Sequence, residues 1–461
     1  MATVIKRNKA LSVSPLKSSQ TIGAALAFLG IERTIPLLHG SQGCTAFGKI
    51  FFVRHFREPI PLQTTAVDQT SAVMGSDGNI VEALATLCAK SSPDLIGLPT
   101  TGLTEAQGSD VERVVKQFYA AHPEYAHIPV VPVSSPDFVG CLESGFANAL
   151  SRMIERLVPL APPTLEVFKR PRLAVLVSAH LTPGDLDEVK DMVGAFGFEP
   201  VVLPDLSTSL DGHLGEGEFS PVTTGGTPVS AFAALHGATA VLGIGASIFP
   251  SARLLGERIG KPVHLFDHLL GLEAVDNFVH ALHKLSGRAV APRLLRDRAR
   301  LQDAMLDTHF MLGLSRLAIA ADPDLLHGLT DLAVGLGAEV VAAVAPTTAA
   351  VLERVKAQTV KIGDLEDLEG LARDHHAQVV IGNSHAVASA ERLGLPILRA
   401  GFPLYDQVGG FQRTWIGYRG SAQVLFDLAN LLLHENHGTV KPYRSRFAPS
   451  EESEYGAPAS A

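Results

Sequence analysis

Short apolar runs alternate with amphipathic stretches along most of the chain, and this alternation limits the fold more than any other feature. Runs this short are typical of strands that are buried on both faces, and the stretches between them, such as Asn79–Lys90 and Asp185–Phe196, have helical spacing. The sequence therefore predicts an α/β protein with parallel sheets covered by helices. The predicted strands are Thr34–Leu38, Asp94–Leu98, Pro129–Val133, Arg172–Ser178, Pro200–Leu203, Ala238–Ile244, Pro262–Phe266, Leu317–Ala320, Glu339–Val344, Gln378–Gly382 and Pro396–Arg399.

Length and local composition divide this alternation into three Rossmann-like domains. A chain of 461 residues suggests about three domains. The proline-rich run Pro159–Pro163 is typical of a linker, and a weaker break follows at Gly287–Pro292. We therefore expect domains at residues 1–163, 164–292 and 293–448. The segment 449–461, rich in Ser, Glu, Gly, Ala and Pro, is expected to be a disordered tail.

Charge and composition exclude several classes of protein. The formal net charge is −9 and there is no basic stripe, which argues against nucleic acid as a main partner. Three cysteines in a chain of this length do not form a disulfide framework. The apolar stretch Ile22–Ile31 is too short to span a membrane. We expect a cytoplasmic protein that binds neither nucleic acid nor membrane.

The turns after the predicted strands do not by themselves identify a ligand. Ligands in such folds bind at the carboxyl ends of strands, and Thr100–Gly102 and Thr223–Gly226 are turns of that kind. The chain has no G-x-G-x-x-G, no P-loop, no H-E-x-x-H and no G-x-S-x-G motif. A self-contained active site is therefore not visible.

Cys44 is the candidate ligand of this chain, in a glycine-containing run that follows the predicted strand Thr34–Leu38. A thiol on such a turn is accessible to a metal or a reactive partner. One cysteine cannot complete a tetrahedral metal site or an iron–sulfur site, so most ligands must come from another chain. Cys88 is expected on the apolar face of a helix. Cys141 begins a long predicted helix and could lie near the site.

Several segments, in this order along the chain, resemble the nitrogenase family, namely the β-subunit of the molybdenum–iron protein and its cofactor-assembly paralogue. The resemblance runs from about Ser14 to Asn430. It implies three Rossmann-like domains with parallel sheets, as in that β-subunit. The segments are Phe52–Leu62, which contains R-H-F-R-E-P, and Pro99–Glu105, Ser135–Cys141, Asp307–His309, Ile381–Ser384 and Gly401–Pro403.

The resemblance implies that Cys44 is a metal ligand. In that family the catalytic β-subunit supplies three cysteines to an eight-iron cluster shared with the α-subunit. Cys44 matches the first of them, whereas Leu62 and Gly102 match the second and third and cannot bind iron. The implied cofactor is a single 4Fe–4S cluster shared with the partner chain. The resemblance assigns no catalytic residue and no contact to a cofactor precursor.

The resemblance implies a cofactor-assembly scaffold rather than an enzyme. The expected partner is a NifE-type subunit in an α2β2 heterotetramer, which holds most of the iron-molybdenum cofactor precursor, and the nitrogenase iron protein NifH docks transiently. The R-H-F-R-E-P run is expected to form a polar network at an interface. One alternative is a catalytic β-type subunit of a nitrogenase-like reductase, against which Leu62 and Gly102 argue. A weaker alternative is a tandem-Rossmann protein for small-molecule binding or glycosyl transfer.

Overall fold

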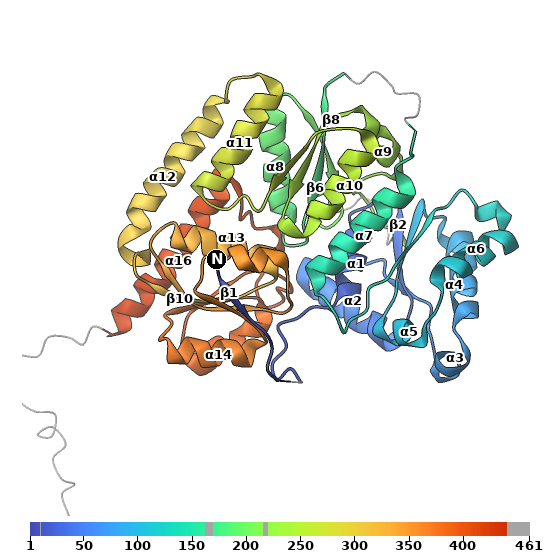
Figure 1. Cartoon of the computed structure of the whole chain (residues 1–461), viewed down its shortest axis with the longest axis horizontal. Coiled ribbons are helices and arrows are strands. Elements are labelled where there is room, and N and C mark those ends of the chain that lie inside the picture. The colour runs from blue at the N-terminus through green and yellow to red at the C-terminus, as the bar shows by residue number, and fades with distance from the viewer. Residues whose placement is uncertain (10, 162–168, 215–219, 440–461) are drawn as a thin grey trace, which may run out of the picture.

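Three parallel β-sheets, each covered by helices, form three lobes (Figure 1). The computed structural model describes residues 1–9, 11–161, 169–214 and 220–439. The strand orders are β3-β2-β4-β5 in the first sheet, β7-β6-β8-β9 in the second and β1-β12-β11-β10-β13-β14 in the third. All strand pairs among the described residues are parallel. The α/β fold expected from the alternation is therefore confirmed.

The first lobe carries Cys44. Its strands β2, β4 and β5 are buried at every residue, as expected for parallel strands covered on both faces. The strands are β2 (Thr34–Leu38), β3 (Gln63–Thr64), β4 (Leu95–Pro99) and β5 (Val130–Val133). The helices are α1 (Gln20–Leu29), α2 (Gln42–Phe56), α3 (Gln69–Met74), α4 (Asp77–Ser91), α5 (Gly102–Gln107), α6 (Val111–Ala121) and α7 (Leu142–Leu157).

The second lobe repeats the strand order of the first. In both sheets the earliest central strand has its successors on opposite sides, so the switch points lie between β2 and β4 and between β6 and β8. The strands are β6 (Arg172–Val177), β7 (Glu199–Leu203), β8 (Ala238–Ile244) and β9 (Val263–Phe266). The helices are α8 (Pro183–Ala195), α9 (Val229–Ala234), α10 (Phe249–Ile259) and α11 (Leu272–Ser286).

The third lobe has a six-stranded sheet whose switch point lies between β10 and β13. Its strands are β1 (Thr3–Ile5), β10 (Arg316–Ala320), β11 (Glu339–Ala345), β12 (Thr359–Ile362), β13 (Val379–Gly382) and β14 (Ile397–Arg399). Its helices are α12 (Pro292–Leu312), α13 (Pro323–Val334), α14 (Leu365–Asp374), α15 (Val387–Leu393) and α16 (Gly417–Thr439). The edge strand β1 comes from the N-terminus of the chain and pairs with β12.

Helices α1 and α7 pack so closely that their contact tolerates only glycine at two positions. A Cβ atom at Gly23 would lie 1.9 Å from the carbonyl oxygen of Leu142, and one at Gly145 would lie 1.9 Å from the carbonyl oxygen of Gln20. Both neighbours are backbone atoms, so a side chain would force the helices apart. This contact places one end of α7 near the middle of the molecule (Figure 1).

Every predicted strand is present with each end within one residue of the prediction, and β2 and β8 agree at both ends. Three short strands, β1, β3 and β12, were not predicted. Because β1 joins the third sheet, residues 3–5 pack with the third lobe, whereas the sequence assigned them to the domain 1–163. Part of the expected linker, residues 162 and 163, and the whole expected tail 449–461 lie outside the described residues. The domain boundaries remain a prediction.

Candidate functional site

Cys44 lies exposed in the first turn of α2, at the carboxyl edge of the first sheet. Ser41 is the N-cap residue, but its side chain makes no capping hydrogen bond. Its hydroxyl donates instead to Cys44 Sγ at 3.3 Å. The turn follows β2 and lies beside the switch point between β2 and β4, where folds of this kind bind ligands. The thiol is therefore at a binding position of the fold and is accessible from outside.

The turn that carries Cys44 is fixed by hydrogen bonds to the turn after β4. The carbonyl oxygen of His39 accepts from the hydroxyls of Thr101 at 2.9 Å and Thr104 at 3.0 Å. Gly40 has no room for a side chain, because a Cβ atom there would lie 2.6 Å from Thr101 Oγ1. The backbone before the thiol is therefore rigidly placed.

The His39 ring supports the turn that carries Cys44 and is not part of the exposed site. Its Nδ1 is 2.9 Å from Thr65 Oγ1 and its Nε2 is 3.3 Å from Ser76 Oγ. Burial lowers the pKa of His39 to about 4, so the ring is neutral at physiological pH. Both ring nitrogens have partners within the chain, and His39 is not available as a second metal ligand in this arrangement.

Leu62 and Gly102 match the other two cluster ligands of the family, and they fail to offer an iron ligand for different reasons. Leu62 is 3% exposed and belongs to the main hydrophobic core under α2. Gly102 opens α5 at the carboxyl end of β4, and a Cβ atom there would lie 2.1 Å from Asp137 Oδ1. One position is filled by the core and the other by a carboxylate, so neither offers an iron ligand.

The other two cysteines are buried. Cys88 packs on α4 in the core of the first lobe, and burial raises the pKa of its thiol to about 11. Cys141 is the N-cap residue of α7 and is 1% exposed, and burial raises the pKa of its thiol well above its ordinary value. The Asp322 carboxyl group of the third lobe lies near this thiol, and its negative charge also raises the pKa of Cys141. Since the thiolate is the form that binds metals, neither residue is a ligand in this arrangement.

An exposed apolar surface surrounds Cys44. Phe47 and Ile50 follow the cysteine at helical spacing on α2 and are 68% and 51% exposed. Large apolar side chains that face water together are typical of an interface. We name the group the Cys44 surface; it comprises Cys44, Phe47 and Ile50 on α2 and Leu103, Phe138 and Val139 on the segments that follow β4 and β5, all exposed. Sequence analysis missed it, although the three-residue spacing of Cys44, Phe47 and Ile50 was visible.

The R-H-F-R-E-P run connects the end of α2 to the third lobe. His55 Nδ1 accepts a hydrogen bond from the Leu404 backbone N–H at 2.8 Å, and burial lowers the pKa of His55 to about 3. The Arg54 guanidinium lies 4.2 Å from the centre of the Tyr405 ring, and Arg57 donates to the Tyr405 carbonyl at 3.2 Å. The run forms a polar network at an interface between two lobes of the same chain.

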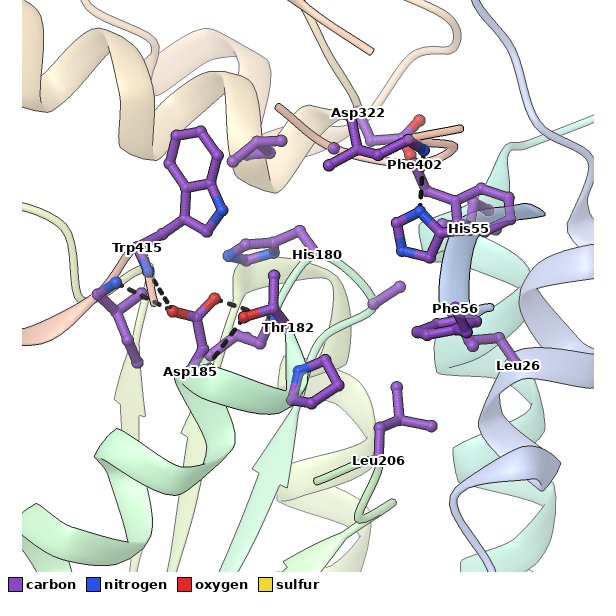
Figure 2. Close-up of a pocket in the computed structure, with 18 of the residues that line it drawn as sticks. Leu26, His55, Phe56, His180, Thr182, Asp185, Leu206, Asp322, Phe402 and Trp415 are labelled. Carbon is purple, nitrogen blue, oxygen red and sulfur yellow. Dashed lines mark hydrogen bonds between the residues drawn. The ribbon is translucent and has the colours of Figure 1, made fainter. Parts of the chain in front are cut away.

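A small cavity lies where the three lobes meet (Figure 2). Its volume is about 40 Å³, which is close to the volume of one water molecule in the liquid. Figure 2 shows Asp185 and His180 on one side and His55 on the other. Asp185 accepts from the backbone N–H groups of Trp415 at 2.6 Å and Ile416 at 3.1 Å, and burial raises its pKa to about 6.

Three carboxyl groups at this meeting point were missed by sequence analysis. Glu143 belongs to the first turn of α7, and Asp322 and Asp324 flank Pro323 at the start of α13. The available signal was the D-P-D sequence, which is typical of a helix N-terminus. The sequence alone does not show that Glu143, far away along the chain, packs against that terminus.

No helix among the described residues is long and apolar enough to cross a membrane.

Comparisons with known proteins agree over nearly the whole chain. The model of the family described as nitrogenase component 1 type oxidoreductase matches residues 19–433. A curated relative, the nitrogenase iron-molybdenum cofactor biosynthesis protein NifN of Klebsiella pneumoniae, is 46% identical, with 98% of each chain covered. The protein of the same name from a Nostoc species is 44% identical, covering 97% of this chain and 99% of the relative. A chain of nitrogenase Cp1, solved at pH 6.5, superposes with a TM-score of 0.86 at 26% identity, with 98% of both chains covered.

Proposed function

The chain belongs to the nitrogenase component 1 type oxidoreductases, and from this membership we propose that it is the β-type subunit of a cofactor-assembly scaffold. The scaffold matures a precursor of the nitrogenase iron-molybdenum cofactor before transfer to the molybdenum–iron protein. The name shared by the similar full-length relatives, iron-molybdenum cofactor biosynthesis protein, supports this role. The subunit itself is not the catalytic component.

One observation carries the proposal: this chain presents a single exposed thiol at a position where the catalytic relative has a cluster ligand. Cys44 is exposed, whereas Leu62 and Gly102 supply no sulfur. A cube of four irons needs four ligands, so the NifE-type subunit supplies the other three to a shared 4Fe–4S cluster. The apolar residues of the Cys44 surface pack against that subunit and exclude water from the cluster.

The cofactor precursor is held mainly by the NifE-type subunit. The cavity at the meeting point of the lobes is about 40 Å³ and has no room for a cluster of several irons. Its walls are also closed by packed side chains such as Phe56, Phe402 and Trp415. The contribution of this chain is therefore one wall and one ligand rather than a chamber.

An α2β2 heterotetramer needs a second, symmetric contact besides the one at Cys44. The chain has another exposed apolar face at α12, where Leu306 and Phe310 are 72% and 90% exposed and Leu314 follows. This helix lies at the outer edge of the molecule, away from α2 (Figure 1). Because a two-fold axis pairs a surface with itself, we assign this face to a second copy of the chain. The assembly is cytoplasmic, and NifH docks on it transiently.

Iron analysis of the co-purified complex tests the proposal. The chain is purified anaerobically with its NifE-type partner, and iron and the visible spectrum are measured for the native chain, Cys44→Ala and Cys88→Ala. We expect one 4Fe–4S cluster per heterodimer in the native chain and in Cys88→Ala, which removes a buried thiol of the same lobe. Cys44→Ala is expected to lose the cluster or to hold it labile to a chelator.

Three results would contradict the proposal. A cluster of unchanged amount and chelator resistance in Cys44→Ala would remove Cys44 from the ligand set. An eight-iron cluster with nitrogenase-like reductase activity in the native complex would favour the alternative of a catalytic β-type subunit. Partner binding without any iron, in both the native chain and Cys44→Ala, would also argue against a shared cluster.

A further inference from the structure

Three potential metal ligands from three lobes meet in the interior. Glu143 of α7, His180 after β6 and Asp324 of α13 each direct one ligand atom to a point where all three atoms lie within 4.8 Å of one another. Glu143 and Asp324 are 2% and 1% exposed. His180 and Asp324 follow strands beside the switch points of the second and third sheets. We name these three residues the junction cluster.

Backbone and hydroxyl groups orient the junction cluster. Both Glu143 carboxylate oxygens accept from the Asp324 backbone N–H, at 3.0 and 3.1 Å. Asp324 accepts from the Ser247 backbone N–H at 3.0 and 3.1 Å and from its hydroxyl at 2.6 Å. His180 Nδ1 lies 2.5 Å from Ser178 Oγ. The side chains are therefore held in position rather than free to rotate.

A glycine allows the backbone to approach the cluster closely. Gly245, just after β8, has φ of +107°, a region that side chains rarely adopt. A Cβ atom there would lie 2.4 Å from Ser178 Cβ and 2.9 Å from Asp324 Oδ2. The backbone after β8 thus passes directly against the Asp324 carboxylate, and any larger residue at position 245 would displace that carboxylate.

The negative charge of the cluster lacks a cationic partner. No ion pair among the described residues joins a lysine or arginine to Glu143, Asp322 or Asp324. Buried carboxylates without a partner are costly, so either a proton or a cation must occupy the site.

Two further histidines lie close to the start of α13, and each has a carboxylate of its own: His327 Nε2 is 3.8 Å from Asp267 Oδ2, and His268 Nε2 is 3.4 Å from Asp331 Oδ2. His327 follows Asp324 by one turn on the same face of α13 and is 6% exposed, and its Nδ1 has no hydrogen-bond partner within the described part of the chain. The His268 ring packs on His327 with ring centres 5.1 Å apart.

We propose that Glu143, His180 and Asp324 bind one divalent cation of the first transition row, of the class of Mn²⁺, Fe²⁺ or Zn²⁺, and that this ion joins the three lobes. Two carboxylates and one imidazole suit such ions. Three equally spaced ligands with bonds of about 2.1 Å lie at most about 3.6 Å from one another, so the three ligand atoms move closer together when the ion binds. The carboxylates repel anions, which excludes oxyanions from the site. The proposal does not depend on the role assigned to Cys44.

Manganese titration of the full-length chain in complex with its partner tests the proposal. Free Mn²⁺ is counted by electron paramagnetic resonance, and manganese is chosen because the iron–sulfur cluster contains none and thiolates bind it weakly. We expect one saturable site per chain. Glu143→Gln and His180→Gln are expected to weaken binding at least tenfold. Asp185→Asn, a change in another buried carboxylate near the same meeting point, should leave the affinity unchanged.

Thermal unfolding provides the second readout, because it reports whether the variants fold. Saturating Mn²⁺ should raise the unfolding midpoint of the native chain and of Asp185→Asn, but not that of Glu143→Gln. The proposal is overturned if the native chain shows no saturable site, or if Glu143→Gln and His180→Gln bind Mn²⁺ like the native chain. Cys44→Ala should bind Mn²⁺ normally, so failure of this site and failure of the shared cluster are separate results.

Discussion

The Cys44 surface and the junction cluster are built at equivalent places of the fold, yet they differ in almost every physical property. Each lies beside the switch point of a parallel sheet. The first is exposed, with one thiol among apolar side chains. The second lies in the interior, with two buried carboxylates and a half-buried imidazole held by backbone N–H and serine hydroxyl groups.

The difference follows from which set of ligands the chain can complete without a partner. The switch points of the second and third sheets face each other through His180 and Asp324, and α7 adds Glu143, so three lobes together supply a full polar site. The switch point of the first sheet faces outward, and Cys44 is the one exposed thiol there among the described residues. A site that is incomplete within the chain is thus left at the surface, where a second chain can complete it.

The largest expected effect is the loss of the partner when the Cys44 surface becomes charged. Phe47→Glu combined with Ile50→Glu would place two carboxylates at the centre of the proposed interface. We expect a loss of about a thousandfold in affinity for the NifE-type subunit, or about 4 kcal/mol. Sedimentation or titration of the purified chains measures it. The unfolding midpoint of the isolated chain should not change, because both side chains already face solvent.

Leu160→Glu is the matched control for that experiment, because Leu160 is exposed beyond the far end of α7. It should bind the partner normally. Normal binding by the Phe47 and Ile50 double variant would show that the Cys44 surface is not the interface, and the contrast between the two regions would then lose its explanation.

The next effect tests the close packing on which the junction cluster depends. Gly145→Ala would place a methyl group 1.9 Å from the Gln20 carbonyl oxygen, so α1 and α7 must separate. We expect a loss of about 3 kcal/mol in the free energy of unfolding, measured by urea denaturation. Gly194→Ala in α8 meets no atom within 4 Å and should stabilise the chain by up to about 1 kcal/mol. Equal effects of the two changes would contradict the packing argument.

The strands differ in how well the sequence could predict them. β2 and β8 were predicted to the residue because continuous apolar runs are a local signal. β3 has only Gln63 and Thr64, and β12 includes the polar residues Thr359 and Lys361, so their strand character comes from pairing with neighbours. β1 pairs with a segment more than three hundred residues away, which no local pattern reports.

The same distinction applies to the two regions. Cys44 was visible because it is a rare residue in a distinctive turn. The junction cluster was not visible, because Glu143, His180 and Asp324 are common residue types on three separate lobes. Asp137, which occupies the space beside Gly102, was likewise identified only by the packing of the two turns. Chemistry that depends on one residue can be predicted locally, whereas chemistry that depends on convergence needs the fold.

A smaller effect, the pH dependence of stability, distinguishes the buried carboxyl groups from those of the exposed Cys44 region. Burial raises the pKa of Asp322 from 3.8 to about 7, so the folded chain holds a proton that the unfolded chain releases. The stability from this proton is present below about pH 4 and is lost as the pH rises toward 7. Asp322→Asn should remove that fall and be more stable than the native chain at pH 8, on the order of 2 kcal/mol.

Thermal melts from pH 4.5 to 8 in the presence of a chelator measure the effect of Asp322→Asn. Asp137→Asn, at an exposed carboxylate of the Cys44 region, should follow the native curve. If Asp322→Asn has the same pH dependence as the native chain, the carboxyl groups at the junction are not forced to hold protons. Added Mn²⁺ should oppose the fall in the native chain, since the positive charge of the bound ion would favour the ionised form of the nearby Asp322 carboxyl group.

The smallest expected effect comes from restoring a sulfur at the Cys44 surface. In Gly102→Cys the new side chain meets Asp137 Oδ1, the tip of a short exposed side chain that can rotate into solvent. We therefore expect a change of less than about 1 kcal/mol in the free energy of unfolding. The iron content of the complex should stay at one 4Fe–4S cluster, because position 62 still has a leucine in the core.

Leu62→Cys is expected to destabilise the chain more than Gly102→Cys does, since it leaves a cavity that costs about 2 kcal/mol or more. A gain of iron in Gly102→Cys alone would show that the exposed region is limited by a missing ligand and not by the closed core beneath it.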